Sequence, residues 1–175
     1  MVKSARLATL LAVATLALAG CGQVDGAATG KEVALEIGPG TTCALDGMLL
    51  ADYPGPKAQV RYEGSAEPEF FCDTVELFSA LLRPEQVRPV KAAFVQDMAK
   101  ADWEQPRGAW IPARDGWYVV GSRRHGSMGP TIASFAEEAD ARKFAAEHGG
   151  QVLPFAGVKP EMVDLSGGAQ HDQKM

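Results

Sequence analysis

The sequence predicts an α+β fold in which two similar β-β-α-β units pack together. The main observation is that strand, strand, helix and strand signals follow one another twice between about residues 41 and 160. The second is size: either unit alone, at roughly 50 residues, would bury too little apolar surface to be stable. We therefore expect a first unit at 41–98 and a second at 99–160 that share one folded body.

The first unit begins with alternating residues at 59–62, which predict a strand, and a second short strand follows at 69–71. Asp73 and Glu76 have the spacing of a capping box and predict a helix that starts there. The apolar residues of that helix fall on one face: Val75, Phe78, Leu81 and Leu82. A strand at 91–96 completes the unit.

The second unit repeats this order. Strands are expected at 109–112 and 117–122, and Ser134 with Glu137 forms a second capping box. One helical face carries the apolar or bulky positions Ala141, Phe144, Ala145 and His148. A glycine pair ends the helix, and 151–155 is the last strand.

The N-terminus has the parts of a secretory signal. Lys3 and Arg6 precede an apolar run at 7–18 that is too short to span a bilayer, which needs roughly 20 apolar residues. The run ends in Leu-Ala-Gly before Cys21, which resembles a bacterial lipobox. That resemblance implies cleavage before Cys21 and diacylation of this residue, which would anchor the chain. Gly22 in the next position favours the outer membrane over the inner one.

The remaining chain is one acidic domain with flexible ends. Removing the 20-residue signal from 175 residues leaves 155 and takes away two positive charges, so the formal charge moves from −5 to −7. An acidic chain argues against nucleic-acid binding. Residues 21–40 are expected to form a lipidated tether and 161–175 a polar tail.

With Cys21 lipidated, two cysteines remain, Cys43 and Cys72. Outside the cytoplasm such a pair usually forms a disulfide, and this is one interpretation. The other is metal binding or reactivity, because Cys72 directly precedes a predicted helix whose dipole lowers a thiol pKa. The sequence leaves both possibilities open.

Sulfur and carboxylate donors gather at 43–48, where Cys43, Asp46 and Met48 fall within six residues and Gly47 allows a tight turn. Met98 and Met128 also stand beside predicted loops rather than in helical or strand patterns. Thiolate and thioether sulfurs prefer Cu(I) to harder ions such as Mg²⁺. These five residues therefore predict a site for monovalent copper.

The sequence has no motif for zinc binding, phosphate binding, serine hydrolysis or dithiol redox chemistry. The histidines have no zinc-like spacing, and no phosphate-binding Gly-rich loop, Gly-x-Ser-x-Gly elbow or Cys-x-x-Cys motif occurs. Trp103 follows Met98 closely and is a candidate shield for a metal, although packing is the simpler interpretation.

Several segments together resemble the NosL family of copper lipoproteins, which assist the assembly of nitrous-oxide reductase. The matching segments are the lipobox, 43–48, 94–103, 117–122 and 128–130. Many members have a second cysteine where this chain has Asp46, so a mixed Asp/Met/Cys site is implied here. The resemblance also implies a fold related to organomercurial lyase. It implies Cu(I) delivery to the reductase with an ABC-type transporter and its periplasmic partner.

We therefore predict a lipid-anchored periplasmic Cu(I) metallochaperone, not an enzyme, that passes its ion on by ligand exchange. One alternative is a thiol-dependent lyase or oxidoreductase that uses Cys43. The other is a metal-free lipoprotein with a Cys43–Cys72 disulfide.

Overall fold

The structure is a computed structural model that describes residues 31–127, 129–163 and 165. The described residues from Glu32 onward form one compact unit. The predicted signal peptide, the lipidation site Cys21, Met128 and most of the tail lie outside the described residues. Within the described ranges, no helix has the length and apolar character needed to cross a membrane.

The first sheet has the strand order β2-β1-β3-β4, and all its neighbours are antiparallel. Its strands are β1 (Ala58–Tyr62), β2 (Glu69–Phe71), β3 (Val90–Gln96) and β4 (Trp110–Pro112). Helix α1 (Thr74–Leu82) packs on the face of β1 that carries Ala58, Val60 and Tyr62. Val75, Leu77 and Phe78 supply the helix side of this core.

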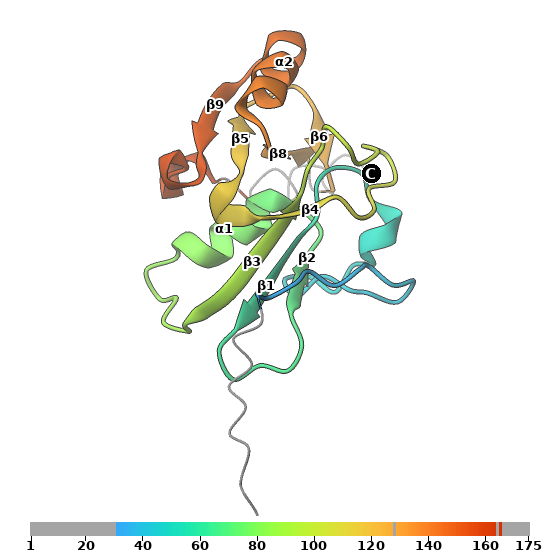
Figure 1. Cartoon of the computed structure of the whole chain (residues 1–175), viewed down its shortest axis with the longest axis vertical. Helices are drawn as coiled ribbons and strands as arrows, with labels where there is room; N and C mark the ends of the chain where they lie inside the picture. Colours follow the sequence, from blue (N-terminus) through green and yellow to red (C-terminus); the bar gives the residue numbers. More distant parts are fainter. Residues whose placement is uncertain (1–30, 128, 164, 166–175) are drawn as a thin grey trace, which may run out of the picture. The chain divides into compact units, whose positions relative to one another are not determined.

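The second sheet has the order β8-β5-β9, formed by β5 (Trp117–Val120), β8 (Ala133–Phe135) and β9 (Gln151–Pro154). Helix α2 (Glu138–His148) packs against it around Ala141 and Phe144 (Figure 1). The two sheets share one arrangement. In the first, β1 lies between β2 and β3, and in the second, β5 lies between β8 and β9. The predicted α+β fold of two β-β-α-β repeats is therefore confirmed.

Two strands differ from the prediction. The segment expected to open the second unit, now β4, pairs with β3 through Val95 and Ile111 and so extends the first sheet. Ser134 does not cap a helix, because it lies in β8 and its hydroxyl donates to the carbonyl of Gln96 at 2.6 Å. The helix starts at Glu138 instead, with Glu137 as the preceding residue.

A short hairpin, β6 (His125–Gly126) with β7 (Gly129–Pro130), lies against the start of α1. Asp73, the N-cap of α1, accepts from the backbone N–H of Val75 at 2.9 Å and from the hydroxyl of Thr131. Gly126 approaches so closely that a Cβ there would collide with Asp73 Oδ2. The hairpin of the second half is thus held at the corner where β2 turns into α1.

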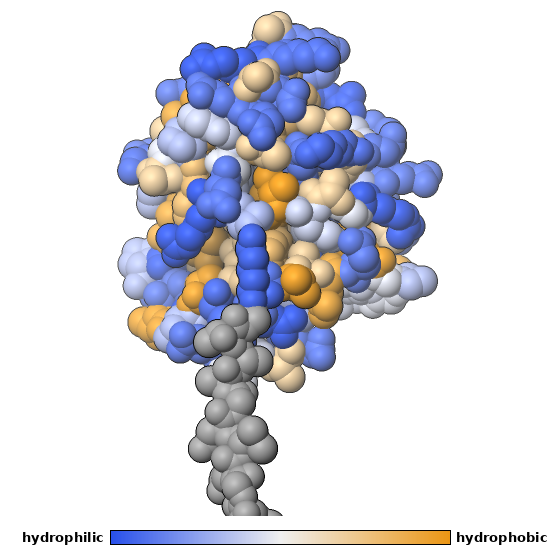
Figure 2. All heavy atoms as spheres, viewed as in Figure 1, coloured by the Kyte–Doolittle hydropathy of each residue, from blue (hydrophilic) through white to orange (hydrophobic). Residues whose placement is uncertain are grey.

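Four 3₁₀ helices complete the described elements: η1 (Leu50–Asp52), η2 (Ala113–Asp115), η3 (Phe155–Gly157) and η4 (Pro160–Met162). On the face of β1 opposite α1, Gln59 accepts from the N–H of Leu35 at 2.9 Å and donates to its carbonyl at 2.8 Å. Glu32 forms ion pairs with Arg61 and Lys91 on the same sheet. The segment at 32–36, held on the sheet by these contacts, continues through Ile37 to Cys43. Figure 2 shows apolar residues on one face as separate patches among hydrophilic ones.

Candidate metal centre

The first part of the site is a closed loop at residues 43–48. An isolated bridge joins Thr42 to Leu49, and the N–H of Cys43 donates to the carbonyl of Met48 at 2.8 Å. The N–H of Gly47 returns to the carbonyl of Cys43 at 2.9 Å, with a φ of 79° that favours glycine. Asp46 Oδ1 accepts from the N–H of Met48 at 2.9 Å. The loop therefore keeps a thiol, a carboxylate and a thioether together.

The second part of the site is the junction between β2 and α1. The N–H of Ala44 donates to the carbonyl of Phe70 at 2.7 Å, which brings the loop beside the end of β2. Cys72 follows that strand, and its N–H donates to Glu76 Oε2 at 3.0 Å. Glu76 in the first turn of α1 thus reaches back in the manner of a capping box, toward the residue before the N-cap.

These two parts bring four potential metal ligands together. Sulfur or oxygen atoms of Cys43, Asp46, Cys72 and Glu76 all lie within 4.8 Å of one another. Cys43 is 4% exposed, Cys72 is fully buried and Glu76 is 1% exposed, whereas Asp46 is exposed. The group is therefore nearly closed, and its open side is at Asp46. Both cysteines are free thiols.

The thiols and Glu76 form a proton-sharing cluster. Cys43 Sγ lies 3.2 Å from Glu76 Oε2, and Cys72 Sγ lies 3.5 Å from Oε1. A hydrogen bond from Cys72 lowers the pKa of the Cys43 thiol to about 6, and the N–H of Leu45, 3.3 Å from the same sulfur, also favours the thiolate. Donation to Cys43 and burial both raise the pKa of Cys72. Burial raises the pKa of Glu76 to about 8.

Two further ionisable groups lie behind the cluster. Burial raises the pKa of Asp73 to about 6, although its bonds to Thr131 and Val75 oppose the shift. Lys57 is 0% exposed, and its Nζ donates to the carbonyls of Pro54 at 2.8 Å and Cys72 at 3.0 Å. Burial lowers the pKa of Lys57 to about 8, and the surrounding acidic groups oppose the shift and favour its ammonium form.

Apolar side chains surround the sulfur atoms. Ile37, Cys43, Leu50 and Cys72 form one buried cluster, and the half-buried side chains of Met48, Phe70 and Trp110 pack against it. The Met48 thioether is thus the methionine sulfur that the described structure places beside the two thiols. Trp110 contacts the same cluster from β4.

Met98 lies in a different environment. It packs with Trp103 and Phe144 against the cluster formed by Val119, Ala133 and Phe135 of the second sheet and Ala141 of α2. Its N–H donates to the carbonyl of Ser134 at 2.9 Å. The structure therefore brings Cys43, Asp46 and Met48 together but places Met98 in a separate cluster. Met98 as a ligand stays a prediction, as does Met128, which lies outside the described residues.

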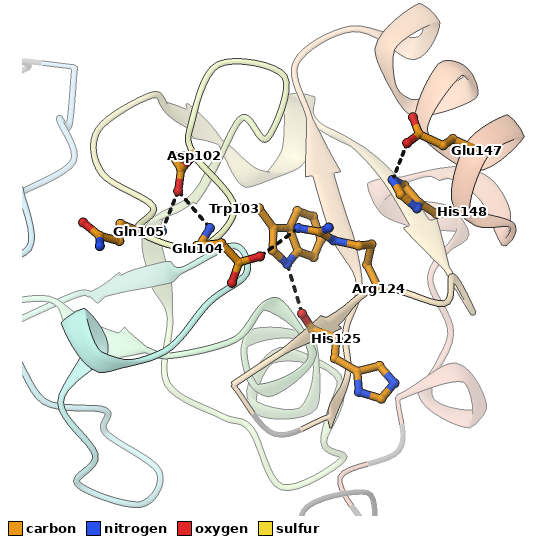
Figure 3. A network of polar contacts seen from close by, with 8 residues as sticks. All are labelled: Asp102, Trp103, Glu104, Gln105, Arg124, His125, Glu147 and His148. Carbon is orange, nitrogen blue, oxygen red and sulfur yellow. Dashed lines mark hydrogen bonds and ion pairs between the residues drawn. The ribbon is translucent and has the colours of Figure 1, made fainter.

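Trp103 belongs to a surface network in the second half (Figure 3). Its ring stacks on Phe144, with centroids 5.4 Å apart, and the Arg124 guanidinium lies 4.5 Å from its centroid. Its indole N–H donates to the carbonyl of His125 at 3.0 Å, and Arg124 pairs with Glu104 at 3.2 Å. These contacts fix Trp103 in packing and explain its position without a metal.

Two thiols and a neighbouring thioether provide donors that suit soft metal ions, and the two carboxylates beside them provide harder oxygen donors. The prediction from sequence missed Glu76 as a member, because its spacing from Asp73 was assigned entirely to helix capping. It also missed Lys57. The available signal for Glu76 was its position in the first helical turn, from which a carboxylate can reach back to the backbone before the helix, where Cys72 lies.

Comparison with known proteins identifies close relatives. The sequence profile of the NosL family matches residues 34–163. The copper-binding lipoprotein NosL of Stutzerimonas stutzeri is 36% identical over 170 residues, covering 93% of this chain and 85% of that protein. The protein of the same description from Achromobacter cycloclastes is 39% identical over 162 residues, covering 90% and 83%. The crystal structure of the copper chaperone NosL from Shewanella denitrificans has a TM-score of 0.72 and 38% identity, covering 75% of this chain and 99% of that one.

Proposed function

Because this chain belongs to the NosL family, we propose that it is a lipid-anchored copper carrier that holds one Cu(I) ion in the centre at 43–76. The observation that supports this most is the gathering of Cys43, Asp46, Cys72 and Glu76 within 4.8 Å. The names of the relatives are those of copper-binding proteins and a copper chaperone, not of enzymes. The chain is a carrier rather than a thiol-dependent enzyme.

The proposed ligands are the Cys43 thiolate, the Met48 thioether and the Cys72 thiol, with Asp46 and Glu76 as oxygen donors. Cu(I) is favoured because thiolate and thioether are soft ligands. Cys43 is suited to this role, because its lowered pKa favours the thiolate form that binds a metal.

Release is proposed to occur by ligand exchange at the exposed side of the site. Cys43, Cys72 and Glu76 are buried, so an acceptor can reach the ion only past Asp46 and the half-buried Met48. An exposed carboxylate and a neutral thioether are weaker ligands for Cu(I) than a thiolate. These two would be replaced first, which suits a carrier that must give up its cargo.

The proposed location is the periplasmic face of a bacterial membrane, with the chain anchored through a lipid on Cys21 and the outer membrane favoured. The proposed destination of the copper is nitrous-oxide reductase, reached with an ABC-type transporter and its periplasmic partner. Metabolic labelling with palmitate, followed by membrane fractionation, tests the anchor. A Cys21→Ser chain that still incorporated the label would contradict it.

Cu(I) titration of residues 22–175 under reducing conditions, read by native mass spectrometry, tests the site directly. We expect one ion per chain, and loss of at least tenfold in affinity for Cys43→Ser, Cys72→Ser and Met48→Leu. Met98→Leu and Met128→Leu test the predicted roles of those two residues, because a loss of affinity in either variant would add that methionine to the ligand set. Full affinity in the Cys43→Ser and Cys72→Ser variants would reject the centre.

The biological role is tested in a denitrifying host that lacks its own copy of this protein. Met48→Ala is expected to restore nitrous-oxide reductase less well than the wild-type chain. The readouts are growth on nitrous oxide and the copper content of the purified reductase. Full copper loading by the variant would contradict the delivery role.

A further inference from the structure

The side chain of Lys57 is fully buried beside the proposed copper site. Lysine is almost never buried completely unless it is paired. Here Nζ donates to two neutral acceptors, the carbonyls of Pro54 at 2.8 Å and Cys72 at 3.0 Å. The acidic groups that act on it, Asp73 foremost and then Cys72, Glu76 and Cys43, do so through space. Among the described residues Nζ forms no ion pair within 4 Å, so its charge acts on the site through space.

We propose that Lys57 determines the charge specificity of the site by favouring a monovalent over a divalent ion. This inference rests on the proposed function, since it assigns the selectivity of the same centre. The reason is Coulombic: a fixed positive charge repels a dication twice as strongly as a monocation at the same position. Thiolates alone would not make this distinction, because soft divalent ions such as Cd²⁺ also bind them tightly.

The expected size follows from the position of Nζ. It lies 3.0 Å from the carbonyl oxygen of Cys72, the residue whose thiol is one of the proposed ligands. An ion held by that thiol is well within ~12 Å of the ammonium. At ~12 Å and an effective dielectric constant of about 20, one unit charge changes binding of a monocation about tenfold and of a dication about 100-fold. The ratio of dication to monocation affinity should therefore change at least about tenfold.

A purely structural role is the competing explanation. Lys57 joins Pro54 to Cys72, so its loss also leaves two carbonyls without a donor. Distortion of the site would weaken both kinds of ion, whereas loss of charge changes them unequally. The affinity ratio separates the two explanations.

The test compares Ag(I), a monovalent soft ion, with Cd(II) in competition titrations at one fixed pH under reducing conditions, using residues 22–175. In Lys57→Met the Cd(II)-to-Ag(I) affinity ratio should rise about tenfold or more. Lys57→Gln removes the same charge but keeps an N–H donor for the carbonyls, and should give the same direction. Lys143→Met, at an exposed position on α2, is the control for net charge and should leave the ratio unchanged.

Asp73→Asn provides the opposite perturbation, because asparagine is also a good N-cap but has no charge. At a pH low enough to keep Lys57 protonated without the Asp73 charge, the ratio should fall in this variant, and this test remains open even if the Lys57 variants do not fold. An unchanged ratio in the folded Lys57 variants, or in Asp73→Asn where those do not fold, would overturn the assignment of Lys57. Absence of Ag(I) and Cu(I) binding to the wild-type domain would instead reject the proposed function.

Discussion

Replacing Glu76 by glutamine should change how the stability of the metal-free domain depends on pH. Glu76 is 1% exposed, and burial raises the pKa of its carboxyl from 4.5 to about 8. Between these two values the folded state keeps a proton that the unfolded state has lost. Stability therefore falls as pH rises through this window, by about 1.4 kcal/mol per pH unit.

Glutamine keeps an acceptor oxygen for the N–H of Cys72 but has no proton to lose. From pH 5 to pH 7 the stability of Glu76→Gln relative to wild type should therefore rise by about 2–3 kcal/mol. Asp73, whose pKa is also raised, contributes to the slope of both proteins and cancels in this difference.

The assay is urea unfolding of residues 22–175 at pH 5, 6, 7 and 8, with a reductant and a metal chelator. The control is Glu85→Gln, which changes an exposed carboxylate and should leave the pH dependence of wild type intact. A constant difference between wild type and Glu76→Gln from pH 5 to pH 7 would refute the argument, because Glu76 would then be ionised in the folded protein throughout.

Three further predictions concern the same region. Thiolate absorbance near 240 nm should show a transition with a pKa of about 6 that Cys43→Ser removes. Cys72→Ala should move the transition upward, because the donor to the Cys43 sulfur is lost, and a transition unaffected by either change would contradict the thiol pair. Gly126→Ala should destabilise the domain by about 1–3 kcal/mol in thermal unfolding, because the added Cβ would collide with Asp73 Oδ2. The control Gly40→Ala should be neutral, since a Cβ there meets nothing within 4 Å, and equal effects of the two changes would disprove the close approach. Cu(I) should quench tryptophan fluorescence mainly through Trp110, because this side chain packs on the cysteine cluster. Trp110→Phe should therefore remove most of the quenching and Trp103→Phe little of it, and the reverse order would place the metal near Met98.

The elements that the sequence predicted well are those whose signals are local. The alternation at 59–62 and the cap at Asp73 depend on neighbours within a few residues, and β1 and α1 occur where they were expected. Pairing is not local: nothing in residues 109–112 indicates that they join β3 rather than β5. Ser134 was misassigned because a serine hydroxyl can cap a helix or donate across strands, and only the position of Gln96 decides.

The candidate site likewise contains residues that local sequence predicts and residues that only the tertiary structure brings in. Cys43, Asp46 and Met48 lie in one short loop, so their proximity follows from the turn at Gly47. Cys72 and Glu76 join them only through the pairing of Ala44 with Phe70, which residue spacing does not reveal. The burial of Lys57 is equally hidden, because lysine in a sequence indicates a surface position.

The hydrogen bonds between the two repeats make the folding of each repeat depend on the other. Asp73 accepts a hydrogen bond from the hydroxyl of Thr131. The hydroxyl of Thr74 donates to the carbonyl of Ile132, and that of Ser134 donates to the carbonyl of Gln96, so each half completes polar groups that the other buries. A chain cut between residues 98 and 109 would leave these groups inside without partners, and severed fragments would have to reassociate before either became ordered. An ancestral single repeat with this interface would therefore have needed to dimerise.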